Sequence, residues 1–159
     1  ALQFGIDEEL IYAIMRQESA FDPHARSFAD AFGLMQILPE VAEAVGQQNN
    51  IPYLGMDDLY EPKVNLLIGA AHIKELLARH RGQFILAVAS YNASEKAIRN
   101  WMKTRFRGDS LEFIEEFPYE ETRTYVRLVM RNMIFYSLFK SKNASIEFPN
   151  WVLNLAPEV

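Results

Sequence analysis

Glu18 has the clearest potential for acid chemistry in this sequence, because helical spacing places its carboxylate at the end of an apolar stripe. The stripe consists of Leu10, Ile11, Ile14 and Met15, on a helix that Asp7 is suited to cap. Burial and the negative end of the helix dipole both disfavour an ionised carboxylate, so we expect the pKa of Glu18 to be raised. A general acid that works near neutral pH needs such a pKa.

A structural role for Glu18 competes with this interpretation. A glutamate at the end of a helix is commonly solvated or paired with an arginine, and Arg16 and Arg123 are available as partners. The helix pattern alone therefore leaves both roles open, and the residues that follow Glu18 have to decide between them.

Three motifs in a fixed order extend the argument beyond Glu18. Residues 18–23 read ESAFDP and lead through residues 24–27 into GLMQILP at 33–39. Residues 90–93 read SYNA, and residues 121–126 read ETRTYV. From about Ile6 to Phe139 the sequence thus resembles the soluble lytic transglycosylases of bacterial cell-wall turnover. Three ordered motifs are a strong signal, whereas any one of them alone would be weak.

The resemblance implies an all-α, goose-lysozyme-like helical domain with a substrate groove. Its activity would be cleavage of the β-1,4 bond between N-acetylmuramic acid and N-acetylglucosamine in peptidoglycan, without water, to give a 1,6-anhydro product. Glu18 matches the family's single catalytic acid, which protonates the glycosidic oxygen and then, as carboxylate, removes the proton of the C6 hydroxyl. The substrate's own N-acetyl group would stabilise the cationic centre, and no cofactor is implied.

Within the first half of the sequence, the resemblance indicates three substrate-binding residues for the sugar chain. Gln36 would hydrogen-bond acetamido or hydroxyl groups, although a glutamine at a turn could equally satisfy backbone groups. A methionine normally fills the core, and only the position of Met35 beside Gln36 suggests that it lines the groove. Ser27 would orient the catalytic carboxylate or simply close the turn after Pro23; the motif favours the first.

In the second half, the indicated substrate-binding residues are Tyr91, Asn92, Glu121 and Tyr125. Tyr91 offers a stacking face and a hydroxyl, and Asn92 would bind substrate or act only as a turn residue. Tyr125 also lies on an apolar helix face, so core packing competes with binding. Glu121 is a second carboxylate near the groove or, as we favour, a first-turn acid stabilised by the helix dipole.

The sequence departs from the family pattern at two places. Residues 29–32 read ADAF, where Asp30 and Phe32 are bulkier than the family's small residues, and Ser94 replaces the glycine of the Tyr-Asn-Ala-Gly turn. The Phe32 ring would either anchor the following turn in the core or protrude into the groove. Ser94 is suited to cap the helix that follows it. We interpret these changes as altered groove width or specificity rather than lost activity.

Composition limits the other classes of function. A chain of 159 residues, half of them apolar, can bury a core without metal or disulfides, and the absence of cysteine excludes thiol chemistry. His24, His72 and His80 lack the spacing of a metal site. A net charge of −5 argues against nucleic acid as the main partner. Arginines such as Arg26 would meet peptide-stem carboxylates or form a solvated face, the safer reading.

The elements that must position these residues are helices. We predict helices over 7–19, 39–45, 62–81, 83–91, 94–104, 110–116 and 119–140, and a short turn around 32–37. Prolines at 39, 62 and 118 mark helix starts, while Gly46 and Gly82 suit C-terminal caps. Residues 46–61 are predicted to form an irregular loop with solvent-facing aromatic groups that could be one lip of the groove.

We expect a catalytic domain over residues 1–140 and a C-terminal tail over 141–159. The tail is expected to dock on the domain because of its apolar residues Phe148, Trp151, Val152 and Leu155. The sequence contains neither a signal peptide nor a transmembrane stretch, so Ala1 would begin a mature product or an excised domain. The family implies the periplasm or cell wall, peptidoglycan strands as the partner, and other domains in a longer parent chain.

Three functions remain open on the sequence. A lytic transglycosylase leads, a lysozyme-like hydrolase of the same fold is second, and a weakly active peptidoglycan-binding scaffold is third because of Asp30 and Ser94. Their products differ: anhydro-terminated muropeptides, reducing ends, or none.

Overall fold

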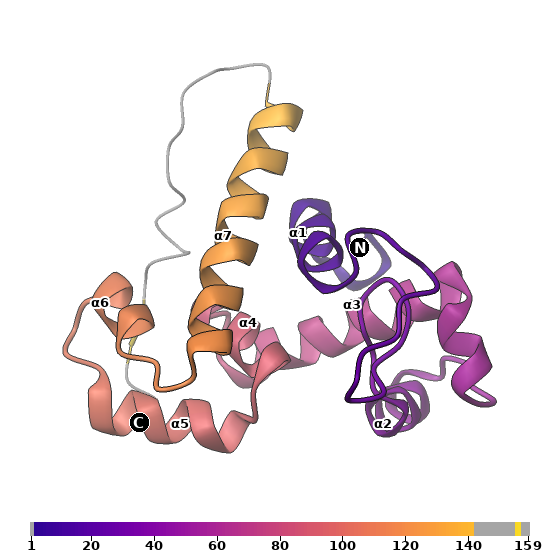
Figure 1. Ribbon diagram of the computed structural model, residues 1–159, viewed down its shortest axis with the longest axis horizontal. Coiled ribbons are helices and arrows are strands. Elements are labelled where there is room, and N and C mark those ends of the chain that lie inside the picture. Colours follow the sequence, from indigo (N-terminus) through magenta and orange to yellow (C-terminus); the bar gives the residue numbers. More distant parts are fainter. Residues whose placement is uncertain (1, 142–154, 157–159) are drawn as a thin grey trace. The chain divides into compact units, whose positions relative to one another are not determined.

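The computed structural model describes residues 2–141 and 155–156, and in this part of the chain every regular element is a helix (Figure 1). The predicted all-α class is therefore confirmed. The chain forms two compact units, within residues 1–74 and within residues 75–159. The boundary falls inside helix α3 (Pro62–Arg79).

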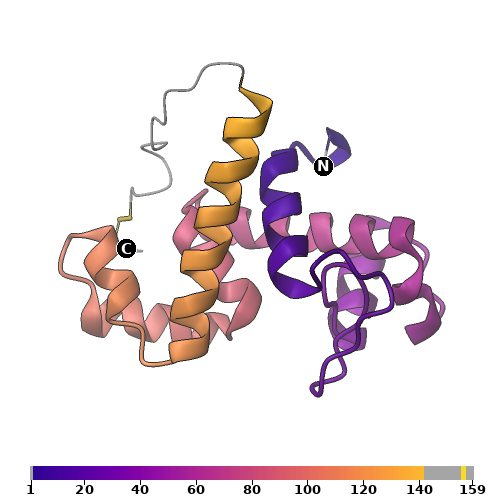
Figure 2. The ribbon, with the colours of Figure 1, turned by 45° about the horizontal axis from the view of Figure 1, so that its top comes forward.

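The first unit holds a long irregular loop between short helices. Its elements are η1 (Leu2–Phe4), α1 (Glu8–Glu18), α2 (Pro39–Asn49), η2 (Met56–Tyr60) and the first part of α3 (Pro62–Arg79). Pro39 and Pro62 each stand at the start of a helix, where the missing backbone N–H costs nothing. Residues 19–38 join α1 to α2, and Figure 2 shows this loop leaving the end of α1.

Helix α2 is longer than the sequence predicted. Gly46 does not cap it but lies buried inside it, and the C-cap is Asn50, which adopts a left-handed φ of 54°. A Cβ on Gly46 would approach the carbonyl oxygen of Ile51 to 3.1 Å, so the glycine serves close packing of the returning chain rather than helix termination. The prediction of an irregular loop over 46–61 is therefore wrong at both ends of the segment. Residues 46–49 belong to α2, and residues 56–60 form η2, in which Leu59 is fully buried.

The second unit is built around α4 (Phe84–Asn92), which is buried from Phe84 to Ser90. It packs against α5 (Glu95–Arg105) and α7 (Glu120–Lys140), and α6 (Ser110–Glu115) packs against α7. Figure 1 shows α7 in orange rising beside α4. The Phe117 ring lies tilted against Trp101 of α5 and edge to face against Phe113 of α6, with centroids 5.1 and 4.9 Å apart.

Two predicted caps of the second unit are confirmed. Gly82, with φ +78°, donates its N–H to the carbonyl of Leu77 at 2.7 Å and closes the end of α3. Ser94 is the N-cap of α5, and its hydroxyl oxygen accepts a hydrogen bond from the N–H of Ala97. The change from glycine to serine at this turn therefore has a local structural use.

The described part of the C-terminal tail makes two hydrogen bonds within the second unit. The N–H of Leu155 donates to the Ser110 hydroxyl at 3.3 Å, and the N–H of Ala156 donates to Gln83 Oε1 at 2.7 Å. Phe148, Trp151 and Val152, on which the predicted docking also rested, lie outside the described residues. Across the described helices, none is both long enough and apolar enough to cross a membrane.

Candidate active site

Glu18 is the last residue of α1, and its side chain is half-buried. The apolar stripe that leads to it is confirmed, because Leu10, Ile11, Ile14 and Met15 are all at most 5% exposed. Asp7 is the N-cap residue, but its side chain makes no capping bond; its backbone carbonyl accepts from Leu10 and Ile11 instead. Packing of the stripe rather than a side-chain cap therefore sets the direction of α1.

The backbone immediately after Glu18 is strained. Ala20 and Phe21 have φ values of 52° and 70°, a region that residues with a Cβ rarely adopt, and Phe21 is 40% exposed. Each such residue costs on the order of 1–3 kcal/mol, and such strain persists where the surroundings hold it, commonly at functional sites. Two consecutive examples beside Glu18 favour a functional over a merely structural helix end.

Ser19 connects this helix end by a hydrogen bond to residues 33–36, the GLMQ turn. Its hydroxyl donates to the carbonyl of Leu34 at 2.8 Å. The turn itself is closed by paired hydrogen bonds between Phe32 and Ile37, both at 3.0 Å. The carboxylate-bearing end of α1 and the predicted sugar-binding turn are thus parts of one hydrogen-bonded assembly within the first unit.

Gln36 is half-buried in a left-handed conformation, with φ 48°. Its Nε2 donates to the carbonyl oxygens of Ala25 and Gly33, at 3.1 and 3.0 Å. These bonds satisfy backbone groups, one of the two roles predicted for Gln36. They use only the N–H groups of the amide, so Oε1 keeps its capacity to accept a hydrogen bond from a sugar acetamido or hydroxyl group.

Ser27 closes the turn over residues 27–31. Its hydroxyl oxygen accepts from the N–H of Ala31 at 3.0 Å, and its own N–H donates to the Ala31 carbonyl at 3.0 Å. This is the turn-closing role that the sequence had left as the second alternative. The orientation of Glu18 by Ser27 stays a prediction.

Met35 is fully buried and packs against Gly69 of α3. A Cβ at position 69 would overlap the Met35 sulfur, so the glycine makes room for this side chain. A side chain with no exposed surface has nothing to present to a sugar. The groove-lining role predicted for Met35 is therefore not supported, and the core role holds.

The two bulky departures from the family pattern both contact Arg26. The Arg26 guanidinium donates to Asp30 Oδ1 at 2.7 and 3.0 Å and lies 5.2 Å from the centre of the Phe32 ring. The hydrogen bond and charge of Asp30 raise the pKa of Arg26. Phe32 is only 3% exposed and meets the Tyr60 ring edge to face at 5.5 Å, so it anchors the turn in the core.

Asn92 lies at the end of α4 and joins that helix to the start of α7. Its Oδ1 accepts from the hydroxyl of buried Thr122 at 2.7 Å, and its Nδ2 approaches Glu121 Oε1 at 3.4 Å. Glu121 is exposed in the first turn of α7, as the helix dipole favours. The structure thus brings Asn92 and Glu121 into direct contact, and Thr122, which was not predicted, holds the other end of the Asn92 amide.

The two predicted tyrosines differ in exposure. Tyr91, beside Asn92 in α4, is half-buried, whereas Tyr125 of α7 is 4% exposed. Core packing of Tyr125, one of its two predicted roles, is therefore observed. Substrate contact by either tyrosine stays a prediction.

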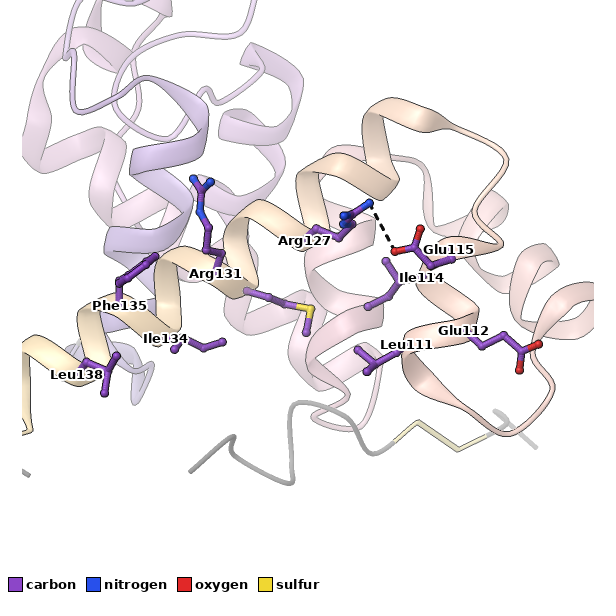
Figure 3. Close-up of a pocket in the computed structure, with 10 residues that line it drawn as sticks. Leu111, Glu112, Ile114, Glu115, Arg127, Arg131, Ile134, Phe135 and Leu138 are labelled. Carbon is purple, nitrogen blue, oxygen red and sulfur yellow. Dashed lines mark ion pairs between the residues drawn. The ribbon is translucent and has the colours of Figure 1, made fainter. Parts of the chain in front are cut away.

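An open apolar groove of about 600 Å³ lies between α6 and α7 of the second unit (Figure 3). Leu111 and Phe135, each 52% exposed, line it, and Arg127 pairs with Glu115 at 3.5 Å on its rim. None of the predicted site residues is among the described residues that line this groove. Its lining includes two acids, Glu112 and Glu115, and Glu115 is the one that pairs with Arg127.

Sequence reasoning missed Asn65, which is fully buried in the first unit and hydrogen-bonded to the GLMQ turn. The available signal was a polar amide on the same face of α3 as Ile68 and Leu76, both of which are buried. His80 is also buried, and its Nε2 lies 2.8 Å from the Ser90 hydroxyl. Over the described residues, no group of three histidine or acidic side chains is placed to hold a metal ion.

Comparison with known proteins decides the family. The family model described as the transglycosylase SLT domain matches residues 1–114, which include Glu18, the GLMQ turn and Asn92. The chain belongs to this family. The first two of the three ordered motifs lie within the matched residues, and the ETRTYV motif at 121–126 lies beyond them.

Curated relatives cover nearly the whole chain. A putative soluble lytic murein transglycosylase of Haemophilus influenzae is 38% identical over 156 residues, 97% of this chain and 26% of the relative. A soluble lytic murein transglycosylase of Salmonella typhimurium is 34% identical over 143 residues, 89% of this chain and 22% of the relative. The chain therefore spans about a quarter of the length of these relatives.

Solved structures of such enzymes share the fold. An inactive glutamate-to-glutamine mutant of lytic transglycosylase Slt from Pseudomonas aeruginosa superposes with a TM-score of 0.88 at 32% identity, over 97% of this chain and 25% of that one. The 70 kDa soluble lytic transglycosylase in complex with bulgecin A gives 0.85 at 31% identity, over 92% and 24%. The lysozyme-like helical fold expected from the resemblance is confirmed.

Proposed function

We propose that this chain is the catalytic domain of a lytic transglycosylase that cleaves the β-1,4 bond between N-acetylmuramic acid and N-acetylglucosamine in peptidoglycan. The observation that carries the proposal is the position of Glu18, half-buried at the end of an apolar helix stripe and followed by strained Ala20 and Phe21. Membership of the transglycosylase family supports it. The inactive Pseudomonas aeruginosa relative supports it too, because a glutamate there was replaced by glutamine, and we propose that Glu18 is its counterpart.

In the proposed reaction, Glu18 first donates its proton to the glycosidic oxygen as the bond from that oxygen to C1 of the muramic acid breaks. The N-acetyl group of the same sugar stabilises the positive charge at C1. The resulting carboxylate removes the proton of the C6 hydroxyl, and O6 bonds to C1 to give the 1,6-anhydro ring. Glu18 ends protonated, so the cycle consumes no water and needs no second carboxylate.

The supporting groups are assigned from the family motifs and, for Gln36 and Asn92, from their hydrogen bonds. Gln36 keeps Oε1 to accept from the substrate, and we assign it to an acetamido or hydroxyl group. In the second unit we assign Tyr91 and Asn92 to sugar binding, with the Asn92 amide oriented by Thr122. Glu121 and Tyr125 remain as substrate-binding candidates beside their structural roles, and Ser27 as a group that orients Glu18.

We place this activity in the periplasm or cell wall, because the relatives are named as soluble and membrane-bound lytic murein transglycosylases. Peptidoglycan strands are the proposed partner. Because the relatives are about four times longer, we also propose that this domain works beside further domains of a longer parent.

Product analysis tests the proposed reaction. Purified sacculi digested with the chain should release muropeptides that end in 1,6-anhydromuramic acid, each lighter by one water than its hydrolysed counterpart, as measured by liquid chromatography and mass spectrometry. Reducing ends would instead assign a lysozyme-like hydrolase, and binding without products would assign a scaffold. Bulgecin A, which the 70 kDa relative binds, should also bind this chain and raise its melting temperature.

A further inference from the structure

Asn65 is a fully buried amide that joins three segments of the first unit. Its Nδ2 donates to the carbonyl oxygens of Phe32 and Leu59, at 2.8 and 2.9 Å, and its Oδ1 accepts from the N–H of Met35 at 2.9 Å. A primary amide offers two donors and two acceptor sites, so three of its four possible bonds are made, all to backbone. A buried side chain used this fully specifies one arrangement of the groups around it.

The bonds of Asn65 hold the GLMQ turn at two points, at Phe32 just before it and at Met35 within it. The Phe32 carbonyl also accepts from the N–H of Ile37, and Met35 is the residue directly before Gln36. Gly33, between them, has φ +72°, and a Cβ there would come within 2.5 Å of the Asn65 amide nitrogen. The same Cβ would come even closer to the Leu59 carbonyl oxygen, so a glycine here leaves room for both Asn65 and the Leu59 backbone against the turn.

The same turn is bonded to the helix that carries the proposed acid. Leu34, next to Met35, accepts the hydroxyl of Ser19, and Ser19 directly follows Glu18. A continuous path of hydrogen bonds and short chain steps thus runs from Asn65 through Leu34 and Met35 to the end of α1. It holds Gln36 and the helix end that bears Glu18 at fixed positions relative to α3.

We propose that Asn65 is a positioning residue for glycan cleavage, which fixes Gln36 and the end of α1 in the geometry that the reaction needs. This inference rests on the proposed function, although Asn65 itself touches no substrate. A displacement of about 1 Å at a catalytic group is enough to cost about a hundredfold in rate. Loss of the three bonds should therefore appear in kcat rather than only in stability.

The main test compares Asn65→Ala with Asn49→Ala in the 159-residue chain. Asn49 is the matched control, because it is a half-buried asparagine of the same unit whose amide donates to a backbone carbonyl, that of Val45, away from the turn. With sacculi as substrate, we expect kcat of Asn65→Ala to fall at least tenfold with circular dichroism unchanged, and kcat of Asn49→Ala to stay within twofold. A folded Asn65→Ala with kcat within twofold of wild type would overturn the proposal.

Asn65→Asp keeps the test decisive if the alanine variant does not fold. The new carboxyl has the shape of the amide and still accepts from Met35, but when ionised it faces two carbonyl oxygens that it cannot serve. When protonated it donates one hydrogen bond. The ratio of its activity to that of wild type should therefore rise as pH falls, and a ratio that is constant with pH would contradict the positioning role.

Amide hydrogen exchange separates this inference from the proposed function. In Asn65→Ala the N–H of Met35 loses its acceptor and should exchange faster while the core amides of α4 keep their protection, whether or not the wild type cleaves glycan. An inactive wild-type chain would refute the proposed function, with Met35 exchange still reporting on Asn65. An active wild type with unaltered Met35 exchange and full activity in the variant would refute only the role of Asn65.

Discussion

At the scale of single residues, the proposed chemistry of this domain rests on Glu18 as the acid. Its apolar stripe, half burial and strained neighbours distinguish it from the many exposed acids of the chain. Arg123, proposed from the sequence as a structural partner, donates to the backbone carbonyls of Glu115 and Phe117 in the second unit. Two predictions follow from the acid role of Glu18.

Glu18→Gln should abolish turnover and leave the fold intact, since the amide is nearly isosteric and cannot donate the required proton. The free energy of unfolding should be unchanged or higher, because an acid held in a partly apolar setting for function is commonly a cost to the folded state. Anhydromuropeptide release from sacculi measures the first effect and thermal unfolding the second. Glu40→Gln, an exposed first-turn glutamate of α2, is the control and should keep full activity. More than a few per cent of wild-type turnover in Glu18→Gln would exclude Glu18 as the acid.

Activity should decline as pH rises through the pKa of Glu18, because the cycle begins with the protonated acid. The sequence predicts a raised pKa; the protonated form would then stabilise the fold fully below the unfolded pKa, and that contribution would be lost as pH rises through the folded one. A carbon NMR titration of the Glu18 carboxyl, read beside the pH profile of kcat/KM, measures this directly. A pKa at or below the ordinary value would contradict the argument from the apolar stripe.

At the scale of the elements, the loop from α1 to α2 is held by contacts of unequal worth. Phe32 is buried against Tyr60, whereas the Arg26–Asp30 pair is exposed and therefore weak. The two departures from the family pattern should accordingly separate in experiment: Phe32 maintains the fold of the turn, and Asp30 contributes an exposed charge paired with Arg26.

Phe32→Ala should lower the free energy of unfolding by about 3–5 kcal/mol, the usual cost of emptying a buried phenylalanine site. Asp30→Gly should change stability by less than about 1 kcal/mol, because glycine suits the φ of 58° at this position and the lost ion pair is exposed. Urea unfolding measures both.

For Asp30→Gly we also expect a change in KM or in product length, with kcat within about tenfold of the wild-type value. A large rise in kcat would instead show that the natural loop suppresses activity.

Ser94→Ala should destabilise α5 by about 1 kcal/mol through loss of the bond from the Ala97 N–H. In a chain of this size, such a loss lowers the melting temperature by about 2–4 °C. Ser94→Gly restores the family residue and should cost less than Ser94→Ala, because glycine leaves the cap groups open to water. Equal melting temperatures for wild type and Ser94→Ala would show that the cap contributes nothing.

At the scale of the whole molecule, each of the two units has its own core, and Leu155 and Ala156 of the tail make hydrogen bonds within the second unit. The bonds of Leu155 and Ala156 to Ser110 and Gln83 support our proposal that the tail is docked on this unit. Gln83→Ala should therefore lower the melting temperature in the full chain and have a smaller effect in a chain that ends at Ser141, because the bond to Ala156 is then already absent. Equal effects in the two chains would contradict the docking of this part of the tail.

Much of this architecture was readable from local pattern. The apolar stripe of α1, the starts at Pro39 and Pro62, the cap at Gly82 and the cap by Ser94 depend on residues within a few positions of one another, so the sequence contains the whole cause. The order of the motifs likewise identified the family and the candidate acid without any coordinates.

Only the tertiary structure decided which side chains the turns would bury. Gly46 is inside a helix because residues 51–53 return across it, Met35 is in the core because Gly69 makes space, and Phe32 points inward because Tyr60 lies beside it. Asn65 bonds to Met35 of the GLMQ turn, although the two residues are 30 positions apart in the sequence. Each outcome depends on a contact between segments that are distant in the sequence. The spacing of neighbouring residues does not predict which distant residue will make that contact.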